Sequence, residues 1–121
     1  MASISSCLPK YDTSWALVIG INKYNKCSPL DYAINDATAV ASLMVEKFEF
    51  PKEKVEVLTD KDATKTAILS AMLRHADGGP NDRGLIFFAG HGHTSTGRRG
   101  EVGFLVPYDS DCDHPSALSP S

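Results

Sequence analysis

A run of strand-forming apolar residues constrains the fold of this chain more than any other feature. Residues 85–89 read Leu-Ile-Phe-Phe-Ala, with Gly84 before them and Gly90 after them. Alternation of apolar and polar residues is typical of a strand with one solvated face, whereas a continuous apolar run indicates a strand covered on both faces. Residues 15–21 (Trp-Ala-Leu-Val-Ile-Gly-Ile) form a second such run. The two runs predict a parallel sheet with helices on both of its faces.

Two amphipathic helices and a short strand at residues 55–58 are predicted between these runs. The first helix is expected from about residue 35 to 48, with Asn35 or Asp36 as its N-cap. The second is expected over residues 65–76, and the Gly-Gly-Pro at 78–80 ends it. The predicted apolar stripes are Ala37, Val40, Ala41, Met44 and Phe48 in the first helix, and Ile68, Leu69, Met72, Leu73 and Ala76 in the second.

This order of strands and helices predicts an α/β fold, a three-layer sandwich around a mostly parallel sheet. Right-handed crossovers give the strand order 2-1-3, with a further short strand at 102–106 after a glycine-bearing loop. The third strand would then be an open edge, for which it is unusually apolar, and this predicts that the chain is part of a larger fold. We expect a flexible segment at 1–13, one domain at 14–108 and a disordered tail at 109–121.

His91 is the candidate catalytic residue, because Gly90-His91-Gly92 directly follows the apolar run at 85–89. Ligands bind outside the carboxyl ends of strands in open α/β sheets, and glycine lets a ligand approach the main chain closely. The alternative is a histidine that is simply solvated or hydrogen-bonded in a surface loop.

Charge and composition exclude several other classes of protein. The net charge is −3, and the basic residues form no patch beyond Arg98-Arg99, which argues against nucleic-acid binding. No apolar stretch is long enough to span a membrane, and the amino terminus lacks a secretory signal. Cys7, Cys27 and Cys112 are scattered and odd in number, so neither a disulfide framework nor a zinc site is expected. These features predict a cytoplasmic protein.

Residues 15–24, residues 30–37 with Ile34-Asn35-Asp36-Ala37, and Phe-Phe-Ala-Gly-His-Gly at 87–92 occur in a familiar order and spacing. Together with Pro107-Tyr108-Asp109 they resemble the large-subunit half of the caspase-like cysteine peptidases of family C14, closer to metacaspases than to animal caspases. The resemblance covers about residues 14–110. It implies a partial caspase-like fold and a thiol protease that hydrolyses peptide or protein substrates, acts in proteolysis and apoptosis, and needs no cofactor.

The resemblance also implies roles for three residues. His91 matches the histidine of a Cys/His dyad, which deprotonates the thiol and then protonates the leaving amine. The backbone N–H of Gly92 matches a donor of the oxyanion hole. Asp36 matches the acidic residue that binds a basic P1 side chain, and its alternative role is the helix cap described above.

The nucleophilic cysteine of the family has no counterpart in these residues. In caspases it lies about 50 residues after the histidine, whereas only 30 residues follow His91 in this sequence. Cys112 lies between two aspartates that disfavour a thiolate, and Cys27 lies in a loop where the family has no catalytic cysteine. We therefore expect a caspase-like domain that stops before its nucleophile and is inactive alone.

Two other functions are compatible with the sequence. A non-enzymatic module could use the open apolar strand to form a homodimer or to pair with a full-length caspase-like relative. A divalent metal could instead bind to a set of imidazoles and carboxylates. That set would comprise His91, His93, Asp109, Asp111 and His114.

Overall fold

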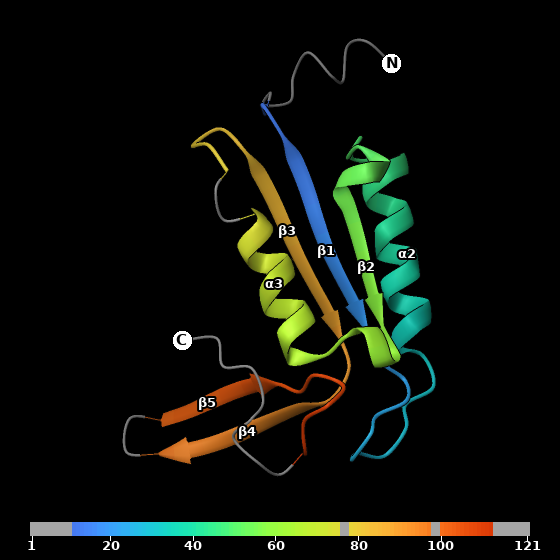
Figure 1. Ribbon diagram of the computed structural model, residues 1–121, viewed down its shortest axis with the longest axis vertical. Coiled ribbons are helices and arrows are strands. Elements are labelled where there is room, and N and C mark those ends of the chain that lie inside the picture. The colour runs from blue at the N-terminus through green and yellow to red at the C-terminus, as the bar shows by residue number, and fades with distance from the viewer. Residues whose placement is uncertain (1–10, 76–77, 98–99, 113–121) are drawn as a thin grey trace.

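A parallel three-stranded sheet forms the centre of the molecule (Figure 1). The computed structural model describes residues 11–75, 78–97 and 100–112. Strand β1 (Ser14–Gly20) lies between β2 (Val55–Thr59) and β3 (Arg83–Ala89) and runs parallel to both. The order β2-β1-β3 confirms the predicted order, and His91 follows the carboxyl end of β3 as expected. Short 3₁₀ turns, Lys52–Lys54 and Asp60–Asp62, flank β2.

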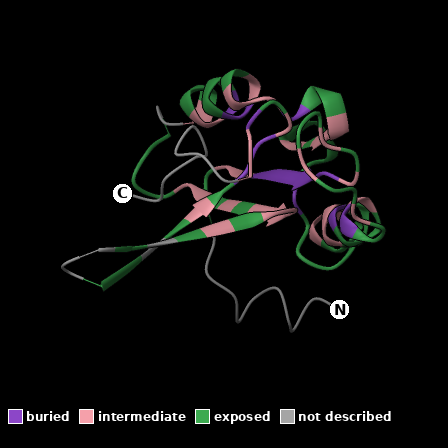
Figure 2. Ribbon diagram, turned by 90° about the horizontal axis from the view of Figure 1, so that it is seen from below, coloured by how far each residue is buried: buried purple, intermediate pink, exposed green. Residues whose placement is uncertain are grey.

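Helices α2 (Ala33–Glu46) and α3 (Lys65–His75) cover opposite faces of the sheet (Figure 2). Successive side chains of a strand point to opposite faces of the sheet, so the continuous apolar run of β1 packs against both helices. Leu17 and Ile19 pack in one cluster with residues of α3, while Ala16 and Val18 pack in the other with residues of α2. All four side chains are almost completely buried.

The start of α2 is capped from outside the helix. The helix begins at Ala33, two residues earlier than predicted, and no side chain at its N-cap position, Tyr32, bonds to the backbone. The prediction that Asn35 or Asp36 is the cap is therefore wrong. Instead, the side-chain oxygen of Asn22 accepts the N–H of Ile34 at 3.2 Å. This is possible because the loop after β1 and the start of α2 lie at the same end of the sheet.

The predicted apolar stripes include the helix residues that pack against the sheet, but they also include residues that are exposed. Phe48, Leu69 and Leu73 are 48%, 41% and 70% exposed, so their predicted burial is wrong. The chain leaves α2 before Phe48, and Phe50 fills the core position instead. The predicted second helix includes Ala76, which lies outside the described residues.

A two-stranded antiparallel sheet lies below the carboxyl ends of the parallel strands (Figure 1). It consists of β4 (Gly92–Gly97) and β5 (Gly100–Leu105), with Gly92 opposite Leu105. The predicted strand at 102–106 corresponds to β5, but the prediction of a loop over the residues of β4 is wrong. The sequence of β4 is polar and glycine-rich, so it carries no burial pattern, and pairing with β5 makes it a strand.

The start of the predicted disordered tail packs against the domain. The carboxylate of Asp109 accepts the N–H of Lys65 at 3.0 Å, Ser110 is buried, and Cys112 is bonded to Cys27. Disorder is therefore the wrong description for residues 109–112. Residues 1–10 and 113–121 lie outside the described residues.

Candidate active site

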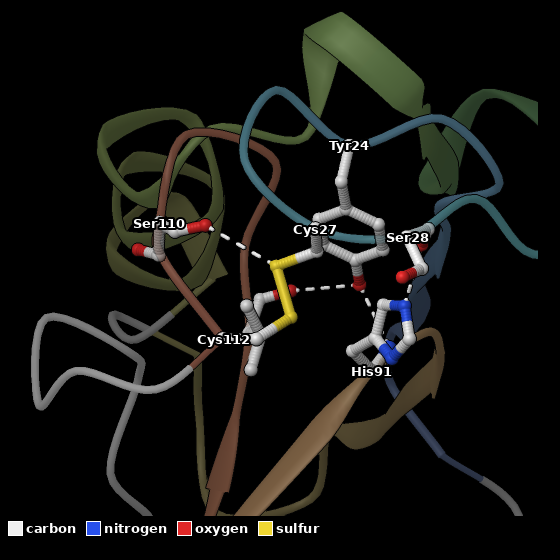
Figure 3. The surroundings of a disulfide bond; sticks show 7 residues. Tyr24, Cys27, Ser28, His91, Ser110 and Cys112 are labelled. Atoms are coloured by element: carbon white, nitrogen blue, oxygen red, sulfur yellow. Dashed lines mark hydrogen bonds between the residues drawn. A yellow bond between two sulfur atoms is a disulfide. The ribbon is translucent and has the colours of Figure 1, made fainter.

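Three segments that are distant in the sequence meet beyond the carboxyl ends of the parallel strands (Figure 3). They are the loop after β1 (residues 21–32), the turn between β3 and β4 that carries His91, and the segment after β5 (residues 106–112). The carboxylate of Asp60 holds the start of the first loop by accepting the N–H groups of Asn22 and Lys23 at 2.9 and 3.0 Å.

A backbone carbonyl orients the imidazole of His91. Nε2 of His91 lies 2.7 Å from the carbonyl oxygen of Ser28 (Figure 3). A carbonyl oxygen can only accept a hydrogen bond, so Nε2 carries the proton in this contact. In the neutral ring Nδ1 then has the free lone pair, which is the state that a general base needs.

Tyr24 holds the backbone beside that imidazole. Its hydroxyl accepts the N–H of His91 at 2.8 Å and donates to the carbonyl oxygen of Val106 at 2.9 Å. The two rings lie with their centroids 4.9 Å apart. Burial raises the pKa of Tyr24 to about 12, and the hydrogen bond from the His91 backbone opposes this rise. The hydroxyl therefore stays protonated at neutral pH and can make both hydrogen bonds.

The two glycines beside His91 are not equivalent. A Cβ atom at position 90 would collide with the Tyr24 hydroxyl and press on the Phe88 ring. A Cβ atom at position 92 would meet nothing closer than the carbonyl oxygen of Phe104 at 3.5 Å. Close packing therefore requires glycine at position 90, whereas the predicted role of Gly92 as an oxyanion donor concerns its backbone N–H and stays a prediction.

Asp36 is an exposed carboxylate in the first turn of α2. It lines an open hollow of about 460 Å³ beside β3. Tyr32, Phe87 and Gly90 line the same hollow, so it reaches the residue next to His91. Asp36 does not cap the helix, so the first of its two predicted roles is wrong. Its second predicted role, binding of a basic side chain, stays a prediction.

Cys27 and Cys112 form a disulfide that joins the loop after β1 to the segment after β5 (Figure 3). The expectation that the cysteines form no disulfide is wrong for this pair. Their separation of 85 residues gives no local pattern that would reveal it. Cys7 lies outside the described residues, and the cytoplasmic location stays a prediction.

The described residues contain no group of three or more His, Cys, Asp or Glu side chains that could hold a metal ion. The ring of His93 instead lies 6.1 Å from that of Phe104 on the neighbouring strand. His114 of the predicted metal set falls outside the described ranges.

Within those same ranges, neither helix is long and apolar enough to cross a membrane.

Sequence reasoning missed three components of this site: the Ser28 carbonyl, the Tyr24 hydroxyl and the disulfide. Tyr24 ends one of the segments that carry the family resemblance, so its place in that motif was the available signal. A backbone carbonyl has no side-chain signature, and only the folded loop brings the Ser28 oxygen to His91.

The fold defines an α/β protein with a histidine at the carboxyl end of a parallel sheet, and comparison with known proteins gives its family. The family model of the caspase domain, peptidase family C14, matches residues 13–117, so the chain belongs to this family. The crystal structure of protein GSU0716 from Geobacter sulfurreducens is similar, with a TM-score of 0.70 and 21% identity. The match covers 89% of this chain and 42% of that one, and it shows the same fold.

Fungal metacaspases are similar in sequence. Metacaspase-1A of Aspergillus oryzae is 37% identical over 89 residues, which are 66% of this chain and 21% of the relative. Metacaspase-1B of Neurospora crassa is 37% identical over 86 residues, 64% of this chain and 20% of the relative. The matched regions thus span about a fifth of the length of these relatives.

Proposed function

We propose that this caspase domain supplies the histidine of a Cys/His dyad for peptide-bond hydrolysis. The contact between Nε2 of His91 and the Ser28 carbonyl oxygen is the observation that carries the proposal, since it leaves Nδ1 as the base. Nδ1 takes the proton of a thiol, the thiolate attacks the peptide carbonyl carbon, and the Gly92 N–H donates to the oxyanion. The imidazolium then protonates the leaving amine, and water hydrolyses the thioester.

In this proposal neither cysteine of the described residues is the nucleophile, and a separate segment of a caspase domain supplies the thiol. Cys27 and Cys112 are bonded to each other in the structure, so neither offers a thiol to His91 while this disulfide is intact. The outer edge of β3 pairs with no other described strand, and it lies beside the hollow next to His91. A further strand along this edge would bring its residues close to the imidazole. The 121-residue polypeptide is then inactive by itself.

We also propose that Asp36 selects basic P1 side chains. Its carboxylate is exposed, lies in the same hollow as Gly90, and forms none of the salt bridges found among the described residues. A lysine or arginine side chain entering the hollow would meet this negative charge before the scissile bond reaches His91.

Complementation tests the dyad. The 121-residue chain is mixed with the part of Aspergillus oryzae Metacaspase-1A that follows its matched region, and cleavage of peptides with Arg, Lys or Asp at P1 is measured. We expect activity on Arg and Lys peptides only in the mixture, reduced about 10²–10⁴-fold by His91→Asn and unchanged by the control His93→Asn. Activity of the isolated chain that disappears in Cys112→Ala would contradict the proposal, as would complemented activity that survives His91→Asn.

The open edge of β3 favours a second candidate, a non-enzymatic module that pairs with a second copy or a full-length relative. Ile86 of β3 is 45% exposed although the strand is apolar. Sedimentation over a range of concentrations tests this, with Ile86→Lys weakening association and Val57→Lys, on the opposite edge strand, leaving it unchanged. A monomer at every concentration that melts above about 60 °C would show that the edge needs no partner.

A further inference from the structure

We propose that the Cys27–Cys112 disulfide is a redox-responsive bond that controls the orientation of the His91 ring. Cys27 directly precedes Ser28, whose carbonyl oxygen contacts Nε2 of His91. The bond therefore lies one peptide unit from the group that determines which imidazole nitrogen carries the proton. The inference rests on the proposed function in treating His91 as the base.

The loop after β1 is well held at its ends and weakly held near Cys27. At its ends, Asp60 accepts two backbone N–H groups, and the N–H of Leu30 donates to the Asn22 carbonyl at 2.7 Å. Nearer the middle, the Tyr24 hydroxyl makes its two hydrogen bonds, and the N–H of Asn25 donates to the Tyr108 carbonyl at the longer distance of 3.3 Å. Asn25, Lys26 and Ser28 are exposed. The disulfide is thus the strongest tie between the middle of this loop and the rest of the domain.

The Cys112 side of the bond belongs to a firmly anchored segment. The N–H of Tyr108 donates to the Ala63 carbonyl at 2.9 Å, and Asp109 accepts the N–H of Lys65 at the start of α3. Val106 and Ser110 are buried. The disulfide therefore fixes the loop that carries Ser28 to a segment held against α3.

Reduction replaces this covalent tie with a weak contact. The Sγ of Cys27 lies 3.7 Å from the carbonyl oxygen of Ser110 (Figure 3). In the disulfide this sulfur has no hydrogen to donate, whereas the reduced thiol is a weak donor to that oxygen. The Ser28 carbonyl then becomes free to move away from Nε2, and the ring loses its fixed acceptor.

The redox step is an exchange with a dithiol. One thiolate of the dithiol attacks a sulfur of the Cys27–Cys112 bond and displaces the other as a thiolate. The second thiol of the reductant then resolves the mixed disulfide. The dithiol is oxidised to its cyclic disulfide, and its two electrons and two protons convert Cys27 and Cys112 to thiols. Both cysteines are partly exposed, so a small dithiol can reach the bond.

The test observes the imidazole directly and needs no catalysis. The full chain with ¹⁵N-labelled histidines is compared by NMR before and after addition of dithiothreitol, and the His91→Asn spectrum assigns the ring. We expect His91 to show a single Nε2–H tautomer when oxidised and a shift toward the tautomer average when reduced. His93 should not change. Cys7→Ser is included in all forms, which prevents exchange with the third cysteine.

Matched variants separate this effect from that of the reductant itself. In the double variant Cys27→Ser with Cys112→Ser, the ¹⁵N chemical shifts of the His91 ring should resemble those of the reduced protein. They should not change when dithiothreitol is added. Thermal melts confirm that each form is folded. Free thiols at both positions in protein kept without reductant, shown by alkylation and mass spectrometry, would overturn the inference. An oxidised protein whose His91 nitrogens do not change on reduction would do the same.

The two proposals can fail separately. If the ring does not respond to reduction while the complemented mixture cleaves peptides through His91, the redox inference is wrong and the dyad stands. If the ring responds but no mixture cleaves peptides, the dyad is wrong and the redox control of the ring stands.

Discussion

Strands β1 and β3 have the same length and nearly the same apolar character, yet they differ sharply in burial. Residues 16–19 of β1 are at most 1% exposed, whereas Ile86 of β3 is 45% exposed and its apolar neighbours are half-buried. The difference lies in position, because β1 has a strand on each side, whereas β3 pairs with β1 alone among the described strands. The apolar composition of a strand therefore indicates that its side chains favour burial. The position of the strand in the described sheet determines how far they are buried.

The two strands also meet the site differently. β1 leads into the loop that provides Tyr24 and Ser28, while β3 leads directly to His91. Their pairing is in register along seven residues, from Ser14 opposite Arg83 to Gly20 opposite Ala89. The loop after the buried strand thus provides the groups that orient the histidine, and the turn after the edge strand provides the histidine itself.

Truncating one side chain in each strand should give the largest difference. Leu17→Ala in β1 removes a fully buried side chain and should lower the free energy of unfolding by about 2–5 kcal/mol. Ile86→Ala in β3 should cost less than about 1.5 kcal/mol, since much of this side chain is already in water. Urea denaturation of both variants measures the difference. Equal losses would show that β3 is as well covered in solution as β1.

The next effect concerns the glycines at the end of β3. Gly90→Ala should displace the Tyr24 hydroxyl and destabilise the fold by about 1–3 kcal/mol, as overpacking does elsewhere. Gly92→Ala is the matched control and should cost under about 1 kcal/mol, because its Cβ has room. Thermal melts compare the two. A larger loss for Gly92→Ala would mean that Tyr24 does not occupy this position.

Tyr24→Phe tests the link between the β1 loop and the β3 turn. It leaves the His91 N–H and the Val106 carbonyl without their partner and should cost about 1–2 kcal/mol. Since the pKa of Tyr24 rises from its ordinary value of 10.0 to about 12 on folding, its contribution is complete below pH 10 and is lost as the pH rises toward 12. The unfolded chain loses the proton first, so alkali favours unfolding.

Urea titrations at pH 8, 10 and 11 measure this dependence. The stability difference between wild type and Tyr24→Phe should shrink as the pH rises above 10. Comparison with the variant removes the contributions of every other ionisable group, because both proteins share them. A difference that stays constant with pH would contradict a buried, hydrogen-bonded hydroxyl.

The smallest effect is expected at β2, the other edge strand. Glu56 of β2 accepts two hydrogen bonds from Arg74 of α3, at 2.7 and 2.6 Å, on an exposed surface. Glu56→Gln should cost about 0.2–1 kcal/mol, and less at high salt. Denaturation in low and high salt measures this. A loss that salt does not alter would mean that the pair is shielded from solvent.

The sequence alone determined the sheet, its strand order, the two helices that cover it and the location of His91 at the end of β3. These features depend on patterns that are local in the chain, namely continuous apolar runs, helical spacing and the Gly-His-Gly motif. The same patterns predicted too much burial for Leu69 and Leu73, since periodicity indicates a face of a helix and not how much of that face the sheet covers.

Only the tertiary structure decided what surrounds the histidine. Its contacts join segments that are separate in the chain. They are the contact of the Ser28 carbonyl with His91, the Asn22 cap of α2, the bond between Cys27 and Cys112, and the contacts of residues 109–112. β4 likewise became a strand through β5 and not through its own composition. Such contacts use backbone atoms, or side chains without a repeating pattern, and they exist only once the fold has brought their partners within bonding distance.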